Sequence, residues 1–463
     1  MSRLFGPKLA AARAAGVLSR RSGRGGGTTL PGRLLLRMAP DAITRLGSRL
    51  HGGTTIVSAT NGKTTTAGMI AAALRAAGRE PVHNRAGSNM TWGVATALLE
   101  QRGSEGLFEG DEAWLPRVAT ELKPRLVVLG NLFRDQLDRY GELEHLADEW
   151  AATVADRAGA TEFALNADDP LVADLGRNTE LARRHGVTYF GIEDEGQAIP
   201  ELQHAFDAKH CRRCGHPYAY ERAFVGHLGH YACPNCHADR PAPDFAATEI
   251  ELDGMTGSRF VVRDPDGEHA VRLPLPGLYN VYNALAALAT AVRLGVPIEQ
   301  AVAGLASVEA AFGRVETIKV ADVPVAILLI KNPAGTNEVL RTLRLEAQGS
   351  SHPRDPLDLW IALNDRIADG RDVSWIWDAD FELLAGIVNR IHCAGTRAPE
   401  LAARLKYAGI DPWRLGVDES IERSLDAAVA TADGWLFALP TYTALIELRT
   451  LLASRGLARE FWR

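Results

Sequence analysis

A short apolar strand that leads through a glycine-lysine turn into a helix constrains this chain most. The turn comprises Ser58-Ala59-Thr60-Asn61-Gly62-Lys63-Thr64-Thr65-Thr66, between a predicted strand at 56–59 and a predicted helix at 67–77. In that setting, backbone N–H groups and the helix N-terminus converge on a phosphate. Lys63 would reach the β- and γ-phosphate oxygens, and Thr64 would offer a hydroxyl to Mg²⁺. The turn is therefore a candidate ATP site, with Lys63 as a candidate catalytic residue.

The turn departs from the general phosphate-loop pattern at one position. That pattern requires glycine at position 57, where this chain has Val57. A plain Gly-Lys turn that caps a threonine-rich helix is the alternative. Agreement among the strand, the turn and the helix favours phosphate binding.

Apolar runs alternate with helical spacing along the rest of the chain. The first predicted strands are 56–59, 126–130, 162–166 and 188–191. Strands at 249–252 and 259–262 and a helix at 279–294 precede a second series, which begins near Arg314 and has strands at 325–330, 357–363, 386–392 and 435–439. Such alternation predicts an α/β fold with parallel sheets covered by helices.

Charge is distributed unevenly. The 463 residues carry 51 Lys+Arg against 57 Asp+Glu, so the whole chain is not suited to neutralise a long run of phosphates. Residues 1–50, however, hold ten basic side chains and a single acid, Asp41. We predict a basic helix over 4–18 and a flexible turn at 23–27, placed either near an anionic membrane surface or packed on the next domain. The longest apolar runs are far too short for a membrane span.

Four of the five cysteines cluster. Cys211-Arg-Arg-Cys214 and Cys233-Pro-Asn-Cys236 have the spacing of a zinc ribbon, in which four thiolates close a tetrahedral structural Zn²⁺ site. Four unrelated thiols are the alternative. Arg212, Arg213 and Arg222 would allow a nucleic-acid-binding ribbon, but nearby aspartates dilute their charge. We therefore interpret 205–243 as an inserted, fold-stabilising zinc ribbon.

Five ordered motifs resemble those of the Mur ligase superfamily. They are Ala59-Thr-Asn-Gly-Lys-Thr-Thr-Thr66, Asn131-Leu-Phe-Arg-Asp-Gln-Leu-Asp138, Leu165-Asn-Ala-Asp-Asp-Pro170, Gly277-Leu-Tyr-Asn-Val-Tyr-Asn-Ala284 and Phe312-Gly-Arg-Val-Glu316. The resemblance implies a basic N-terminal segment at 1–50, a Mur ligase-like central ATP-binding domain at 51–313 that contains the ribbon, and a Rossmann-like C-terminal α/β domain at 314–463.

The resemblance also implies site residues. The expected ATP-binding residues are Thr60, Asn61, Gly62, Lys63, Thr64, Thr65, Asn283 and Arg314, with Thr64 and Glu109 as Mg²⁺ ligands. Glu109 could instead lie in a solvated acidic turn, and Asn283 could be an ordinary hydrogen-bonding residue at a helix N-terminus. Gln136 and Tyr279 stand where the superfamily has histidines, so those two roles are not transferred.

A further signature narrows the resemblance to the MurT family. It combines Leu329-Ile-Lys-Asn-Pro-Ala-Gly335 and Leu363-Asn-Asp-Arg-Ile-Ala-Asp-Gly-Arg-Asp-Val-Ser-Trp-Ile-Trp-Asp378 with the single ribbon. The family implies amidation of the D-glutamate α-carboxylate in the lipid II stem peptide by ATP, through an acyl phosphate. It also implies Mg²⁺, structural Zn²⁺, ammonia from a GatD-type glutaminase subunit, lipid II or a related precursor as acceptor, no nucleic acid, and a cytoplasmic site that could adjoin the membrane.

The chain shows no convincing glutaminase of its own. Cys393 follows a predicted apolar strand and His392 would face the other side of that strand, so Cys393 is interpreted as a buried small residue. By resemblance, Asp372 is the second catalytic residue and orients the histidine of the partner glutaminase. A loop carboxylate that caps Ser374 is the alternative. At the level of function, the alternatives are a self-sufficient Mur or folylpolyglutamate-type ligase and a zinc-ribbon nucleic-acid-binding ATPase.

Overall fold

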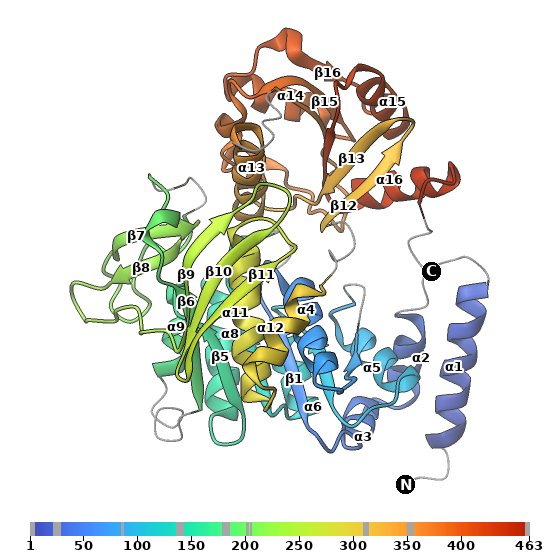
Figure 1. Ribbon diagram of the computed structural model, residues 1–463. Helices are drawn as coiled ribbons and strands as arrows, with labels where there is room; N and C mark the ends of the chain where they lie inside the picture. Colours follow the sequence, from blue (N-terminus) through green and yellow to red (C-terminus); the bar gives the residue numbers. More distant parts are fainter. Residues whose placement is uncertain are drawn as a thin grey trace.

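The computed structural model describes residues 5–21, 29–84, 88–135, 143–177, 186–200, 203, 206–308, 314–349 and 356–458. Two large sheets organise these residues (Figure 1). The first has nine strands between residues 54 and 273, and the second has six strands between residues 314 and 440. The predicted domain boundary at residue 313 lies outside the described residues and stays a prediction.

The nine-stranded sheet has a parallel centre and an antiparallel edge. Its order is β11 (Gly267–Leu273), β10 (Ser258–Asp264), β9 (Phe245–Leu252), β6 (Val187–Ile192), β5 (Glu162–Asn166), β4 (Leu126–Leu129), β1 (Thr54–Ser58), β3 (Gly106–Glu109) and β2 (Val82–His83). Strands β1 to β6 and β9 pair in parallel, whereas β10 pairs antiparallel with both β9 and β11. The predicted parallel sheet is confirmed, with an antiparallel extension.

Helices cover both faces of this sheet. Alternate residues of one strand point to opposite faces, so Val57 and Ile56 of β1 belong to different apolar clusters. Val57 faces α4 (Lys63–Ala76), α11 (Leu278–Arg293) and α12 (Ile298–Ala306). Ile56 faces α1 (Phe5–Arg21), α2 (Leu30–Met38), α3 (Ala42–Gly47), α5 (Thr91–Glu100), α6 (Leu115–Leu122) and α8 (Leu143–Arg157). The short helices α9 (Pro170–Ala173), η1 (Asp174–Arg177) and η2 (Glu195–Gln197) lie in connecting loops.

The basic N-terminal segment packs on the rest of the chain. Lys8 donates a hydrogen bond to the Met38 carbonyl at the end of α2, and Arg13 donates to the Leu99 carbonyl near the end of α5 at 2.9 Å. Arg49 also donates to the Leu98 carbonyl. Cations at helix C-termini satisfy carbonyls that lack intrahelical partners. Residues 5–21 and 29–50 thus pack on the rest of the chain, as one of the two interpretations of 1–50 proposed. The predicted turn at 23–27 lies outside the described residues.

The four-cysteine module lies between β6 and β9. It contains the hairpin of β7 (Ala219–Val225) and β8 (Leu228–Ala232), whose turn is Gly226-His227. The hairpin forms a separate antiparallel sheet beside the nine-stranded one (Figure 1). Among the described residues, this module interrupts the parallel α/β order between β6 and β9, and the predicted bounds 205–243 stay a prediction.

The six-stranded sheet carries the C-terminal part of the chain. Its order is β12 (Arg314–Val320), β13 (Val323–Leu328), β17 (Leu436–Pro440), β14 (Leu357–Ala362), β15 (Val388–Ala394) and β16 (Leu415–Val417). All pairs are parallel except β12 with β13. The flanking helices are α13 (Pro333–Gln348), α14 (Ala398–Tyr407), α15 (Ile421–Thr431) and α16 (Tyr442–Ser454), with short helices η3 (Ser374–Trp377), η4 (Phe381–Leu384) and η5 (Pro412–Arg414).

Cys393 lies inside β15, not after it as predicted. Its side chain is fully buried, and burial raises the pKa of the thiol to about 12. His392 contacts the Thr431 hydroxyl through Nε2 at 3.0 Å. A buried, protonated thiol is a poor nucleophile, in agreement with the predicted structural role.

Short or polar strands were missed by the sequence analysis. Strands β2, β3, β7, β8, β11, β12 and β16 were not predicted, and β3 contains Glu109, for which a solvated acidic turn was one interpretation. Glu109 is 1% exposed, so that interpretation is wrong. Within the described ranges, no helix combines the length and the apolar character needed to cross a bilayer.

Gly32 tests how α2 and α5 pack. A Cβ atom at Gly32 would lie 1.8 Å from the Trp92 carbonyl oxygen, and Gly32 N donates to the Thr96 hydroxyl at 2.9 Å. We expect Gly32→Ala to lower the free energy of unfolding by about 2 kcal/mol or more, because backbone must move. Gly68→Ala is the control, since its Cβ would meet nothing within 4 Å. It should raise stability by about 0.5–1 kcal/mol in the same urea titration; equal effects would contradict the packing.

Candidate functional site

The glycine-lysine turn begins helix α4 in a conformation that needs glycine. Gly62 has φ 91°, and a Cβ there would lie 2.0 Å from Asn283 Oδ1. Asn283 comes from α11, where it accepts a hydrogen bond from the Thr66 hydroxyl at 3.1 Å and donates to Asn280. The turn and α11 are therefore in direct contact, and the expected contact of Asn283 with ATP stays a prediction.

Lys63 is buried with its charge matched. Its Nζ lies 2.7 Å from Glu112 Oε2 and also donates to the Ala59 carbonyl. Burial acts to lower the pKa of Lys63, but Glu112 and Asp111 outweigh it and hold that pKa above its ordinary value. Lys63 therefore stays cationic at the N-terminus of α4, where anions are favoured.

Thr64 and Glu109 are brought together from α4 and β3. The Thr64 hydroxyl donates to Glu109 Oε2 at 2.9 Å, and Asn84 fixes the Glu109 backbone by accepting from its N–H at 2.8 Å. Glu109 Oε1 has no hydrogen-bond partner among the described residues, and His83 Nε2 lies 3.8 Å away. A hydroxyl and a carboxylate with a free oxygen suit Mg²⁺, so this pair fits the predicted metal site.

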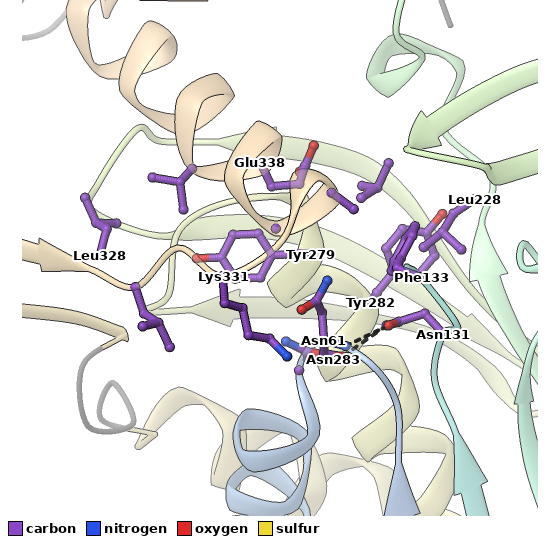
Figure 2. A pocket seen from close by; sticks show the side chains of 16 residues that line it. Asn61, Asn131, Phe133, Leu228, Tyr279, Tyr282, Asn283, Leu328, Lys331 and Glu338 are labelled. Atoms are coloured by element: carbon purple, nitrogen blue, oxygen red, sulfur yellow. Dashed lines mark hydrogen bonds between the residues drawn. The ribbon is translucent and has the colours of Figure 1, made fainter. Parts of the chain in front are cut away.

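The segment that follows β4 also binds the glycine-lysine turn. Asn131 accepts from Asn61 N at 2.9 Å and donates to Asn61 O at 3.1 Å, as Figure 2 shows for the first contact. The Thr60 hydroxyl accepts from Phe133 N at 3.0 Å. Thr60 and Thr65 are both buried, whereas Asn61 and Gly62 are partly exposed.

The C-terminal sheet reaches the same turn from the opposite side. Asn332 and Asn61 exchange amide hydrogen bonds at 3.0 and 3.2 Å. Lys331 donates to the Thr60 carbonyl at 3.0 Å and lies 2.6 Å from Asp135 Oδ2. Lys331 and Asn332 follow β13 and precede α13. The end of one sheet is thus joined to the turn of the other.

A cleft lies where the two sheets meet. It contains about 810 Å³ of empty space, part of it open to solvent. Figure 2 shows side chains from the glycine-lysine turn, α11, the end of β13, α13 and the β7–β8 hairpin around it. The labelled lining residues are Asn61, Asn131, Phe133, Leu228, Tyr279, Tyr282, Asn283, Leu328, Lys331 and Glu338. The cleft adjoins the N-terminus of α4, so a nucleotide could place its base here and its phosphates on the turn.

Other predicted positions cannot be placed in full. Gln136 lies outside the described residues, as do Phe312 and Gly313. Arg314 begins β12, but its side chain is outside the described part, so its expected contact with ATP stays a prediction. Tyr279 lines the cleft, in the position where the superfamily has histidine.

The four cysteines converge. Their sulfur atoms lie within 4.8 Å of one another, and three neighbouring pairs are 3.5 Å apart. Four sulfurs bound at about 2.3 Å to one Zn²⁺ would lie about 3.8 Å apart, so the cluster fits a closed tetrahedral site. Hydrogen bonds from Asn235 and the His216 backbone lower the pKa of Cys214 to about 6, which favours the thiolate that a metal needs.

Ion pairs already engage the arginines of this module. Arg212 is paired with Asp148, and Arg213 lies 2.6 Å from Asp174. Arg222 lies 2.7 Å from Glu195. The positive charge that would suit a nucleic-acid ligand is thus neutralised within the chain.

Asp372 lies in an exposed loop before η3. It accepts a hydrogen bond from Ser374 N at 2.8 Å, and this bond lowers its pKa. Asp372 therefore caps the backbone of Ser374, as the alternative interpretation proposed, and remains accessible. Nearby Trp377 is 50% exposed and its ring lies 5.8 Å from that of Tyr407, which is 73% exposed.

The sequence analysis missed three residues that complete the site. Lys331 and Asn332 were present in a quoted motif but had no role there, and Glu112 belonged to none of the quoted motifs. Glu112 could have been found from its position three residues after Glu109, in the turn that follows β3. Lys331 and Asn332 follow a strand end, where parallel sheets place ligand-binding residues.

Two sequence families match the chain. The MurT ligase C-terminal family matches residues 329–445, and the Mur ligase middle domain family matches residues 57–238. The MurT subunit of the glutamine-hydrolysing lipid II isoglutaminyl synthase from Streptococcus pneumoniae is 32% identical and covers 98% of both chains. The subunit of the same name from Staphylococcus aureus strain N315 is 32% identical over 91% of this chain and 92% of its own length.

Solved structures share the fold. A pseudomurein peptide ligase type C from Methanothermus fervidus superposes with a TM-score of 0.66 at 23% identity, over 89% of this chain and 80% of its own. The MurF ligase of Thermotoga maritima, solved in complex with ADP, gives a TM-score of 0.61 at 14% identity, over 90% and 84%. The predicted Mur ligase-like α/β fold is confirmed.

Metal content tests the cysteine cluster. We expect the purified chain to carry about one zinc ion per molecule by elemental analysis, because the four thiols form one closed site. Cys214→Ser should lower that content severalfold. Cys393→Ser is the matched control and should leave it unchanged, since Cys393 lies in β15. Zinc loss in both variants would contradict the assignment.

Proposed function

The chain belongs to the MurT family, and we propose that it is the ligase subunit of a lipid II isoglutaminyl synthase. In this proposal it uses ATP to amidate the D-glutamate α-carboxylate of the lipid II stem peptide, and a glutaminase subunit supplies ammonia. The observation that carries the proposal is the grouping of Lys63, Thr64 and Glu109 at the start of α4, beside a cleft that can hold a nucleotide.

The chemistry requires that the acceptor first be activated. A carboxylate resists attack by ammonia, so transfer of the γ-phosphoryl group would convert it to an acyl phosphate. Ammonia then forms the C–N bond, the C–O bond to phosphate breaks, and the nitrogen loses a proton. Phosphoryl transfer depends on positioning and on stabilising charge, and Lys63 at the N-terminus of α4 supplies both.

Thr64 and Glu109 would hold Mg²⁺, which when bound neutralises charge on the phosphates. Glu109 is suited to this because one of its oxygens is bonded to Thr64 and the other has no hydrogen-bond partner among the described residues. Glu112 keeps its own charge, since Lys63 and Lys331 lower its pKa although burial opposes them. Glu112 can therefore hold the Lys63 ammonium in place until a phosphate competes for it.

The nucleotide base would occupy the cleft between the sheets. Apolar and aromatic side chains line most of it, whereas polar groups gather at the end near Asn61 and Asn283. This arrangement suits a flat base with its phosphates directed at the turn. Thr60, Asn61, Gly62, Thr65 and Asn283 are the residues we assign to ATP, together with Lys63, Thr64 and Arg314.

The partner subunit would dock on the C-terminal part. Cys393 is buried and protonated, so the nucleophilic cysteine for glutamine hydrolysis must come from elsewhere. Asp372 is accessible and ionised, and the exposed rings of Trp377 and Tyr407 adjoin its loop. Exposed aromatic residues of this kind are typical of protein interfaces. We therefore place a GatD-type glutaminase on this loop, with Asp372 orienting its catalytic histidine.

The acceptor places the reaction at the cytoplasmic face of the membrane. Lipid II or a related precursor carries the stem peptide, and the chain would approach it as a peripheral protein. The structural Zn²⁺ takes no part in this chemistry, because four thiolates leave no open coordination position.

Lys63→Ala tests activation of the carboxylate. Because activation precedes both nitrogen routes, we expect glutamine-dependent and ammonium-dependent amidation to fall together, by about a hundredfold or more. The measurement is formation of the amidated precursor by the assembled complex with each nitrogen source. Retention of either route would contradict the assignment.

Asp372→Asn tests the contact with the glutaminase. The asparagine oxygen can still accept from Ser374 N, so the loop should persist while the charge is lost. We expect glutamine-dependent amidation to fall by about a hundredfold or more and ammonium-dependent amidation to persist. The control is Asp411→Asn, which removes a charge from another exposed residue of the C-terminal part. It should leave both routes of amidation intact. Equal glutamine use by Asp372→Asn would remove Asp372 from the mechanism.

A further inference from the structure

The hairpin of the four-cysteine module forms part of the cleft. Val225 at the end of β7 and Leu228 at the start of β8 both line it. Gly229 N, at the same end of the hairpin, donates to the Asp168 carbonyl at 2.9 Å, and Asp168 in turn accepts from Tyr282 of the cleft at 2.6 Å. The insertion therefore supplies a wall of the proposed nucleotide site.

The hairpin also seats helix α13 of the C-terminal part. Arg341 on α13 donates to the Phe224 carbonyl of β7 at 2.7 Å. The same guanidinium lies 3.1 Å from Glu338, which lines the cleft and is 2% exposed. Movement of the hairpin would thus disturb two walls of the cleft, its own and that of α13.

Aromatic side chains fill the module from the cysteines toward the hairpin turn. Tyr218 packs against the buried Cys211 and Cys233. The Tyr218 ring lies 5.1 Å from that of Tyr231, and the Tyr231 ring lies 6.0 Å from that of Tyr220. Tyr220 belongs to β7, so ring contacts connect the cysteine cluster with the hairpin.

The packing continues into the cleft. The Tyr220 ring lies 4.6 Å from Phe206, and Phe206 lies 6.5 Å from His227 in the hairpin turn. His227 is fully buried and lies 4.7 Å from Phe133, a residue that lines the cleft. Phe133 N donates to the Thr60 hydroxyl of the glycine-lysine turn. The rings from Tyr218 to Phe133, hereafter the aromatic column, are thus neighbours with centroids 4.6 to 6.5 Å apart, and the last of these residues reaches the phosphate turn through its backbone N–H.

We infer that the four-cysteine module is coupled to the nucleotide site through the aromatic column, so that metal bound to the cysteines strengthens nucleotide binding and nucleotide strengthens metal binding. The inference rests on the proposed nucleotide site. Its basis is that protein interiors are close-packed, so a module that loses its metal cannot keep the column and the cleft wall in place. Coupling between two sites is reciprocal by thermodynamic necessity.

The test measures nucleotide binding by the full chain, not activity. Calorimetric titration with Mg²⁺ and a non-hydrolysable ATP analogue is carried out on the zinc-loaded chain and on the chain stripped by a chelator. We expect about tenfold weaker binding after stripping, within the usual range of coupling between sites. The reverse experiment follows zinc transfer to a chromogenic chelator at equilibrium. Saturating analogue should raise the zinc affinity by the same factor.

Two variants locate the coupling in the aromatic column. Phe206→Leu removes the central ring and keeps an apolar side chain, so it should retain zinc and bring the coupling factor close to one. Glu221→Gln is the matched control, because Glu221 is an exposed residue of β7 outside the column, and its coupling factor should match that of the unmodified chain.

Equal affinities of the loaded and stripped chains, with the stripped chain folded by circular dichroism, would overturn the coupling. If stripping unfolds the chain, the reverse experiment decides. A zinc affinity that is the same with and without saturating analogue would then overturn the coupling. Full coupling in Phe206→Leu would remove the aromatic column from the account. Failure of the zinc-loaded chain to bind the analogue at all would overturn the nucleotide site itself, and the coupling with it.

Discussion

The amide pair between Asn61 and Asn332 joins the two sheets at the place where chemistry is proposed. Each amide donates to the other, and Lys331 adds a bond to the Thr60 carbonyl next to it. Because these groups are largely buried, separating the sheets would leave polar atoms without partners, which is costly. This contact lies beside the cleft and acts together with the bond from Arg341 of α13 to the Phe224 carbonyl of the hairpin. These hydrogen bonds help to set both the position of the C-terminal sheet and the shape of the proposed nucleotide site.

Charge around the turn is balanced pair by pair. Lys63 is matched by Glu112, and Lys331 by Asp135, so two buried or half-buried ammonium groups are held without a net cost of unpaired charge. Glu109 differs in its partner, which is a hydroxyl. Its Oε2 accepts a hydrogen bond from Thr64, but its Oε1 has no hydrogen-bond partner among the described residues. A site in which cations are already paired and one carboxylate keeps an open oxygen is prepared for a metal-bound phosphate, which would replace the internal partners without large rearrangement.

Local signals explain what the sequence could predict. Strand β1, the turn and α4 follow from residue type and order, and the cysteine cluster follows from spacing alone. Strand β3 was missed because Gly106–Glu109 is short and ends in a charged residue that looks solvated. The Asn61–Asn332 pair spans 271 residues, and no local pattern reports such a distance. The aromatic column was equally hidden, because no strand was predicted around its tyrosines and Phe133 belongs to a motif on another element. Asp372 was recognisable only by resemblance, since its own contact is a local cap.

A crystal structure of the chain with Mg²⁺ and a non-hydrolysable ATP analogue would test the central claim most directly. The account predicts the terminal phosphates at the N-terminus of α4, within reach of Lys63 and with the metal on Thr64 and Glu109. It further predicts the base in the cleft between the β7–β8 hairpin and α13. A nucleotide bound at any other place, or one that leaves the Thr64–Glu109 pair untouched, would contradict it.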